Sequence, residues 1–123
     1  MARILVIEDD PFMGALLYQL LGDEGHDVVQ ASDGEEGMRL HGQSPADLLI
    51  TDIVMPGKEG LATIREFQKV SPDVPIIAIS GGGLTGKNYL PLAEDLGASR
   101  IFTKPFKPED ILAAIGDLLG DTS

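Results

Sequence analysis

The chain has 123 residues, a length that fits one domain with a hydrophobic core of its own. Twenty acidic residues against nine Lys and Arg give a formal net charge of −11, which disfavours direct contact with the phosphate backbone of a nucleic acid. There is no cysteine and no apolar run near the ~20 residues of a membrane span, so disulfides, thiol chemistry and membrane insertion are excluded. We expect a cytoplasmic protein.

Short apolar segments alternate with segments of helical periodicity along the chain. Several of them, such as Ile4–Ile7 and Ile76–Ile79, are apolar at consecutive positions, which is typical of strands covered on both faces in a parallel sheet. The predicted strands are Arg3–Ile7, Asp27–Ala31, Asp47–Thr51, Pro75–Ile79 and Arg100–Thr103.

Each predicted strand is followed by an amphipathic helix. Asp10 and Pro11 predict the N-cap and first residue of the first helix, and Ser32 with Glu35 predicts a capping box for the second. The first helix is marked by a stripe of apolar residues, Met13, Leu16, Leu17, Leu20 and Leu21. The third is marked by Leu61, Ile64, Phe67 and Gln68, and the fourth by Leu90, Ala93 and Leu96 before Gly97. The fifth begins at Pro108, with Ile111, Leu112, Ile115, Leu118 and Leu119 on its buried face. Five such units joined by right-handed crossovers predict a doubly wound α/β sandwich, whose ligand site lies at the carboxyl ends of the strands.

Acidic residues gather at that edge of the predicted sheet. Glu8, Asp9 and Asp10 follow the first strand, and Asp52 follows the third. Carboxylates at close range either raise one another's pKa or recruit a cation, and a site made only of oxygen ligands favours Mg²⁺. Asp10 stands before a proline, which favours a helix cap over a metal ligand.

Two further polar residues end strands at the same edge. Ser80 follows the fourth strand and Lys104 the fifth. At that position the ammonium of Lys104 can counter a carboxylate or bind an incoming phosphoryl group.

Four segments, in this order and spacing, resemble the motifs of response-regulator receiver domains, the CheY-like family. They are Ile4–Asp10, Leu48–Gly57, Ile77–Gly81 and Lys104–Phe106, and the resemblance extends over essentially the whole chain. The resemblance implies one receiver domain over residues 1–123, with a flavodoxin-like (βα)5 fold and a five-stranded parallel sheet of order 2-1-3-4-5. It also implies a role in phosphorelay signalling.

The resemblance assigns roles to the acidic residues. Asp52 matches the aspartate that accepts a phosphoryl group from a histidine kinase. Asp9 matches the acid that binds Mg²⁺ directly, Glu8 its neighbour that often acts through water, and Val54 the residue that lends a backbone carbonyl to the metal.

The resemblance also covers the polar residues after the last two strands. Ser80 matches the switch hydroxyl and Lys104 the lysine of the family pattern, with a cis peptide expected before Pro105. One position departs from the family, because Ile101 stands where an aromatic residue often couples the site to the output face. Phe102 is expected on the opposite side of the strand and is a poor substitute.

The expected partners are a sensor histidine kinase or phosphotransfer protein and a downstream protein that the sequence does not identify. We expect a switch that gains and loses its phosphoryl group, with no turnover of a substrate as in an enzyme. Four residues follow Leu119, which favours a single-domain response regulator over one shortened before an output domain.

Four other interpretations of the sequence compete with a phosphorylated receiver domain. Gly81–Asn88 resembles a P-loop, but Asn88 stands where a Ser or Thr would bind Mg²⁺, and the acidic strand precedes the loop. A flavin carrier of the same fold class would meet repulsion from the carboxylates after the first strand. A phosphatase using an aspartyl phosphate would carry an Asp-x-Asp signature there, which is absent. A receiver that binds partners without phosphorylation remains open. His26 and His41 receive no catalytic role.

Overall fold

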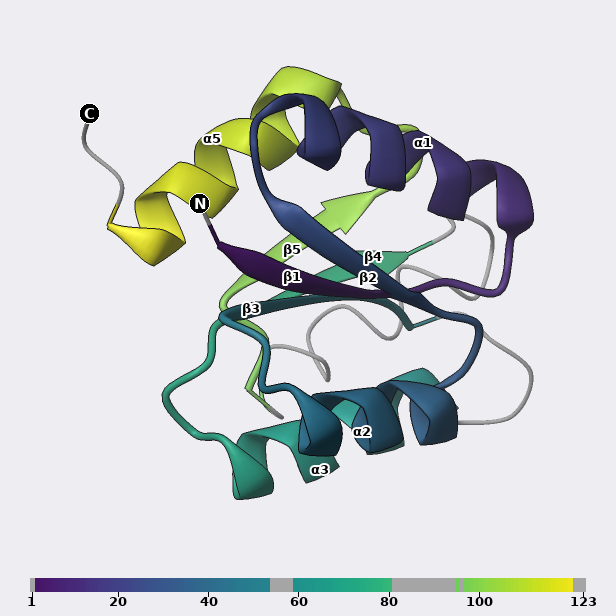
Figure 1. The fold of residues 1–123 in the computed structure, drawn as a ribbon, viewed down its shortest axis with the longest axis vertical. Coiled ribbons are helices and arrows are strands. Elements are labelled where there is room, and N and C mark those ends of the chain that lie inside the picture. Colours follow the sequence, from purple (N-terminus) through teal and green to yellow (C-terminus); the bar gives the residue numbers. More distant parts are fainter. Residues whose placement is uncertain (1, 54–58, 81–94, 96, 121–123) are drawn as a thin grey trace.

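The computed structural model describes residues 2–53, 59–80, 95 and 97–120 of the chain. Its centre is a parallel five-stranded sheet of order β2-β1-β3-β4-β5, as the resemblance implies. The strands are β1 (Arg3–Ile7), β2 (Asp27–Ala31), β3 (Leu48–Asp52), β4 (Ile76–Ser80) and β5 (Arg100–Thr103). Figure 1 shows α1 (Pro11–Asp23) and α5 (Pro108–Leu119) on one face of the sheet, and α2 (Gly34–Gln43) and α3 (Glu59–Val70) on the other.

The bounds of β3 and β4 were predicted one residue too early. Both strands include the polar residue at their carboxyl end, because the backbone ladder continues past the last apolar side chain: Asp52 pairs with Ile79, and Ser80 pairs with Thr103. The backbone N–H of Ile53 also donates to the carbonyl of Ile79 at 2.9 Å. Asp52 and Ser80 are therefore held by the sheet itself, which is more rigid than a loop.

Successive residues of the central strands point to opposite faces of the sheet and pack into two separate core clusters, one on each face. Leu5, Ile7 and Leu49 pack with Ile64 and Phe67 under α2 and α3. The alternate residues of the same strands pack under α1 and α5, in a cluster that contains Ile4, Val6, Leu48, Ile50, Leu17, Leu21, Ile111 and Ile115. Because every central strand is covered on both faces, its sequence is apolar at consecutive positions.

Helix α1 begins as predicted, with the side chain of Asp10 accepting a hydrogen bond from the N–H of Phe12 at 3.0 Å. Its apolar stripe is buried only in part. Gly14, Leu17 and Leu21 are buried, whereas Leu16 is 48% exposed. Leu16 lies about 100° around the helix from Leu17, away from the sheet.

The predicted capping box of α2 is displaced by one residue. Asp33 is the N-cap, and its side chain accepts from the N–H of Glu36 at 2.8 Å. The carboxylate of Glu36 accepts in turn from the N–H of Ser32 at 2.8 Å. Gly37 faces the sheet so closely that a Cβ would overlap the side chain of Ile7. The absence of a side chain at Gly37 therefore allows the close approach of α2 to β1.

The other helices follow the predicted pattern where they are described. Leu61, Ile64 and Phe67 are buried in α3, and Ile111 and Ile115 in α5. The fourth helix expected around Leu90, Ala93 and Leu96 lies outside the described residues; Gly97 is described, with a φ of +128°. No helix in the described part of the chain is long and apolar enough to span a membrane.

Candidate functional site

Three carboxylates meet at the carboxyl edge of the sheet. Glu8 and Asp9 follow β1, Asp52 ends β3, and one oxygen from each lies within 4.8 Å of the others. The two strands bring them together because they are neighbours in register, with Ile7 opposite Thr51. Asp10 is not part of this cluster, since its side chain caps α1.

The ammonium of Lys104 reaches into the same cluster from the end of β5. Its Nζ lies 2.8 Å from Oδ2 of Asp52 and 3.1 Å from Oε1 of Glu8. The second oxygen of Glu8 accepts the backbone N–H of Asp10 at 3.1 Å, a contact that no sequence pattern predicted. The peptide bond between Lys104 and Pro105 is cis, as the resemblance implied.

Burial and charge perturb the groups in this cluster. Burial, with the nearby charge of Asp52, raises the pKa of Glu8 to about 7, although the Asp10 N–H and Lys104 oppose the shift. For Lys104, burial lowers the pKa, but the hydrogen bond and charge of Asp52, with those of Glu8, outweigh it and raise the pKa above its usual value. Lys104 is therefore an ammonium at neutral pH and offsets part of the negative charge of the carboxylates.

The hydroxyl of Ser80 is fully buried and has no hydrogen-bond partner among the described residues. A buried hydroxyl without a partner costs roughly 1–3 kcal/mol. Ser80 ends β4, the strand next to β3, and its carbonyl accepts the N–H of Lys104 at 2.8 Å. A donor is thus available at the same edge of the sheet as the carboxylates.

The remaining predicted positions fall in two groups. Val54 and Gly81–Asn88 lie outside the described residues. Ile101 packs into the core cluster under α2 and α3, whereas Phe102 packs into the cluster under α1 and α5. The two side chains therefore lie on opposite faces of β5, as expected, and Phe102 does not replace the usual aromatic residue.

The donor set suits a hard divalent cation. Carboxylates are ligands typical of Mg²⁺, and one oxygen from each of the three residues lies close enough to the others for one ion to contact all three. A groove of about 610 Å³ between α2 and α3 includes none of these residues, so it is a separate feature of the surface.

The sequence model of one protein family, the response regulator receiver domain, matches residues 4–116 of the chain. The chain belongs to this family. It is 35% identical over 119 residues to the transcriptional regulatory protein CpxR of Klebsiella pneumoniae, covering 97% of this chain and 50% of that protein. It is 34% identical to the transcriptional regulatory protein GlrR of Escherichia coli, covering 96% of this chain and 26% of that protein. The chain thus spans half or less of these curated relatives.

Solved receiver domains have the same fold. A response regulator receiver domain protein from Clostridium thermocellum superposes with a TM-score of 0.87 at 32% identity, covering 98% of this chain and 95% of that one. The receiver domain of NtrX from Brucella abortus superposes with a TM-score of 0.88 at 29% identity, covering 97% and 99%. The chain is therefore a receiver domain of the two-component response regulators, a family that signals through phosphorelays, interacts with histidine kinases and binds Mg²⁺ at an acidic pocket.

Proposed function

We propose that this receiver domain accepts a phosphoryl group on Asp52 and changes its surface for a downstream protein in response. The observation that carries the proposal is the convergence of Glu8, Asp9 and Asp52 with the ammonium of Lys104 at one edge of the sheet. The buried hydroxyl of Ser80, at the end of the neighbouring strand, adds a donor for the phosphoryl group.

The chemical step is a displacement at phosphorus. A carboxylate oxygen of Asp52 forms a bond to the phosphorus of a phosphohistidine, the P–N bond breaks, and the electron pair remains on the imidazole of the donor. The product on this chain is an acyl phosphate. The sheet holds Asp52 in place and the side chain is 4% exposed, so the nucleophile is ordered before the donor arrives.

Lys104 and Ser80 would bind the transferred group. The Lys104 ammonium is already 2.8 Å from Asp52 and can shift its contact to a phosphoryl oxygen, because both are anionic. The Ser80 hydroxyl, which has no partner among the described residues, can donate to another phosphoryl oxygen. A change in the position of Ser80 and the residues after it would transmit the event to the surface.

Asp9 and Asp52 would hold Mg²⁺ directly, with Glu8 assisting and the carbonyl of Val54 as a further ligand implied by the resemblance. When bound, Mg²⁺ supplies positive charge beside the transferring oxygens. Burial and then the charge of Asp52 raise the pKa of Glu8, and a cation held by these residues would offset that charge.

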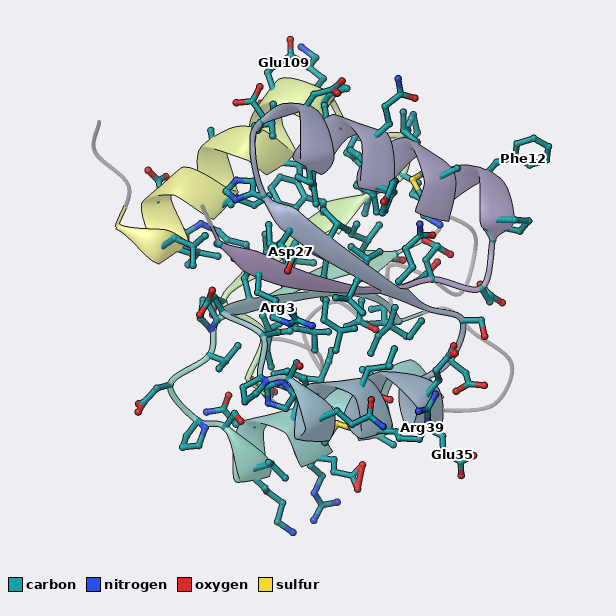
Figure 2. All side chains as sticks on the ribbon, in the orientation of Figure 1. Arg3, Phe12, Asp27, Glu35, Arg39 and Glu109 are labelled. Carbon is teal, nitrogen blue, oxygen red and sulfur yellow. The ribbon has the colours of Figure 1, made fainter. Side chains whose placement is uncertain are left out.

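The expected donor is a sensor histidine kinase or a phosphotransfer protein. Phe12 lies in the first turn of α1, three residues after Asp9, and Figure 2 shows its ring pointing away from the sheet. This exposed ring gives a protein donor an apolar contact beside the site. The net charge of −11 disfavours contact of this domain with nucleic acid, and a cytoplasmic, non-enzymatic switch remains our proposal for the chain.

Incubation with acetyl phosphate and Mg²⁺, followed by intact mass spectrometry, tests the assignment. The wild-type chain should gain one phosphoryl group, and Asp52→Asn should gain none. Asp10→Asn is the matched control, because Asn also caps helices and Asp10 lies outside the cluster. A wild-type chain that gains no phosphoryl group would favour a receiver that works without phosphorylation.

A further inference from the structure

His41 occupies a buried corner on the α2–α3 face of the sheet. It lies in the last turn of α2, and it is 4% exposed. Its ring packs on Phe67 of α3, with the centroids 4.3 Å apart. Two hydrogen bonds join it to other segments: Nδ1 to the backbone of Ala46, just before β3, and Nε2 to the hydroxyl of Ser71, just after α3.

The backbone contact fixes the protonation of the ring. The N–H of Ala46 donates to Nδ1 at 3.0 Å, so Nδ1 must carry a lone pair. In a neutral imidazole the proton is then on Nε2, which donates to Oγ of Ser71 at 2.8 Å. His41 in this geometry accepts one hydrogen bond and donates one, and both partners lie outside its own helix.

These two bonds hold three segments together. Ala46 belongs to the turn between α2 and β3, and the next residue, Asp47, donates its N–H to the carbonyl of Arg3 at 2.7 Å. Ser71 continues the last turn of α3, because its N–H donates to the carbonyl of Phe67 at 2.8 Å. Ala46 precedes β3 and Ser71 precedes β4, so the corner lies at the amino edge of the sheet, opposite the acidic cluster.

A second proton on this ring conflicts with the structure. If Nδ1 binds a proton, it becomes a donor that faces the N–H donor of Ala46, and one of the two must move. The contact to Ser71 survives, because Nε2–H still donates. Protonation therefore breaks only the bond that ties α2 to the turn before β3.

The charged groups on the surrounding elements do not remove this conflict. Arg3 of β1 lines the small cavity beside His41, and its guanidinium pairs with Asp27 of β2 at 2.9 Å. The carboxylate of Asp47 accepts the N–H of Arg3 at 2.8 Å. Arg39 of α2 and Lys69 of α3 are cations on exposed residues. No acidic partner bonds to the ring among the described residues, so a positive charge on His41 would gain no ion pair.

We propose that His41 is a proton-operated latch. In its closed state the neutral ring bonds to Ala46 and Ser71 and so joins α2 to α3 and to the turn before β3. In its open state Nδ1 is protonated and the bond to Ala46 is broken. Burial lowers the pKa of His41, which agrees with a closed state that excludes the second proton. In the open state the ring meets water and regains the pKa of an exposed histidine, near 6.5. Acid therefore shifts the population from closed to open.

Two NMR measurements on the full ¹⁵N-labelled chain test the latch. Long-range correlations of the imidazole nitrogens should show the Nε2–H tautomer at pH 7.5. Hydrogen-exchange protection factors, measured from pH 7.5 to 5, should then fall at Ala46 relative to Asp47, whose N–H bonds to Arg3 and not to the ring. The fall should reach about tenfold for each unit by which the folded-state pKa of His41 lies below that of an exposed histidine.

Three variants separate the latch from other causes. His41→Asn keeps an acceptor near the place of Nδ1 but cannot titrate, so the protection of Ala46 should no longer depend on pH. His26→Asn, at the other histidine, should leave the wild-type dependence intact. Ser71→Ala removes only the Nε2 partner and should also retain it, which keeps the test decisive if His41→Asn does not fold.

Three results would overturn the proposal. The first is an Nδ1–H tautomer at pH 7.5. The second is a protection factor of Ala46, relative to Asp47, that stays constant through the titration of His41. The third is a variant result of the wrong kind, in which the pH dependence of Ala46 protection survives in His41→Asn or disappears in Ser71→Ala.

Discussion

The ammonium Nζ of Lys104 lies 2.8 Å from Oδ2 of Asp52, although 52 residues separate the two along the chain. The parallel sheet makes this contact possible, since β3 and β5 both end at its carboxyl edge and only β4 lies between them. The lysine side chain extends past the end of β4 to Asp52 and also reaches Glu8, the residue after β1. It acts as an internal cation within the acidic cluster.

Removing this cation should destabilise the metal-free domain. In Lys104→Met the buried carboxylates of Glu8 and Asp52 lose a charged hydrogen-bond donor, and we expect a loss of about 1–3 kcal/mol in the free energy of unfolding. Urea unfolding measures it, with Lys107→Met, at an exposed position, as the control. Mg²⁺ should recover part of the loss. Equal stability of the two variants would show that the ion pairs contribute nothing.

Asp9→Asn should weaken Mg²⁺ binding and slow phosphorylation by acetyl phosphate together, because one of three clustered carboxylates loses its charge. The same change should raise the stability of the metal-free chain, since repulsion within the cluster is relieved. Titration with Mg²⁺ and urea unfolding, with Asp10→Asn as the control, check both effects. Unchanged Mg²⁺ affinity in Asp9→Asn would contradict the proposed metal site.

Two glycines of α2 should respond to alanine with opposite signs. A Cβ at Gly37 overlaps the side chain of Ile7, so Gly37→Ala should cost about 1–3 kcal/mol through overpacking. A Cβ at Gly42 meets no atom within 4 Å, so Gly42→Ala should stabilise the helix by about 0.5 kcal/mol. Paired denaturation curves give both values. A neutral Gly37→Ala would mean that α2 can move away from β1 without cost.

Overall stability should depend on pH through His41. Burial lowers its pKa in the folded state, so the unfolded chain binds more protons between that lower value and about 6.5. The contribution of His41 to the free energy of unfolding should therefore rise with pH across this window and be lost as the pH falls below about 6.5. Glu8 contributes with the opposite sign, because its raised pKa of about 7 makes the folded chain bind more protons, so His41 is identified by comparing variants. The slope should be smaller in His41→Asn than in His26→Asn. Equal slopes would exclude His41 as the cause.

Ile101→Tyr should leave phosphorylation of Asp52 intact. Ile101 packs into the core under α2 and α3 and contacts none of the acidic cluster through a hydrogen bond or ion pair, so the change alters the route from the site to the surface and not the chemistry. Acetyl phosphate labelling at equal Mg²⁺ checks this. A variant that folds but labels much more slowly would place Ile101 within the chemical site.

Apolar runs and helical periodicity predicted the doubly wound α/β sandwich, and the strand ends placed Glu8, Asp9 and Asp52 at its carboxyl edge. The sheet order, which makes β1 and β3 neighbours, came from the resemblance to receiver domains. Sequence patterns misplaced details that depend on tertiary contact. Whether Leu16 or Gly14 faces the core depends on the rotation of α1 over the sheet, which periodicity leaves free within one residue. The packing of Gly37 on Ile7 and the hydrogen bonds of His41 join distant segments, and no local pattern marks them.

The most direct test of the central claim is chemical mapping of the phosphorylated residue. Borohydride reduces an acyl phosphate to an alcohol, so treatment of the labelled chain should convert Asp52 to homoserine, and peptide mass spectrometry should find that change at position 52 alone. The account predicts conversion at Asp52 that requires both acetyl phosphate and Mg²⁺. Conversion at Asp9 or Asp10 with Asp52 unchanged would contradict it.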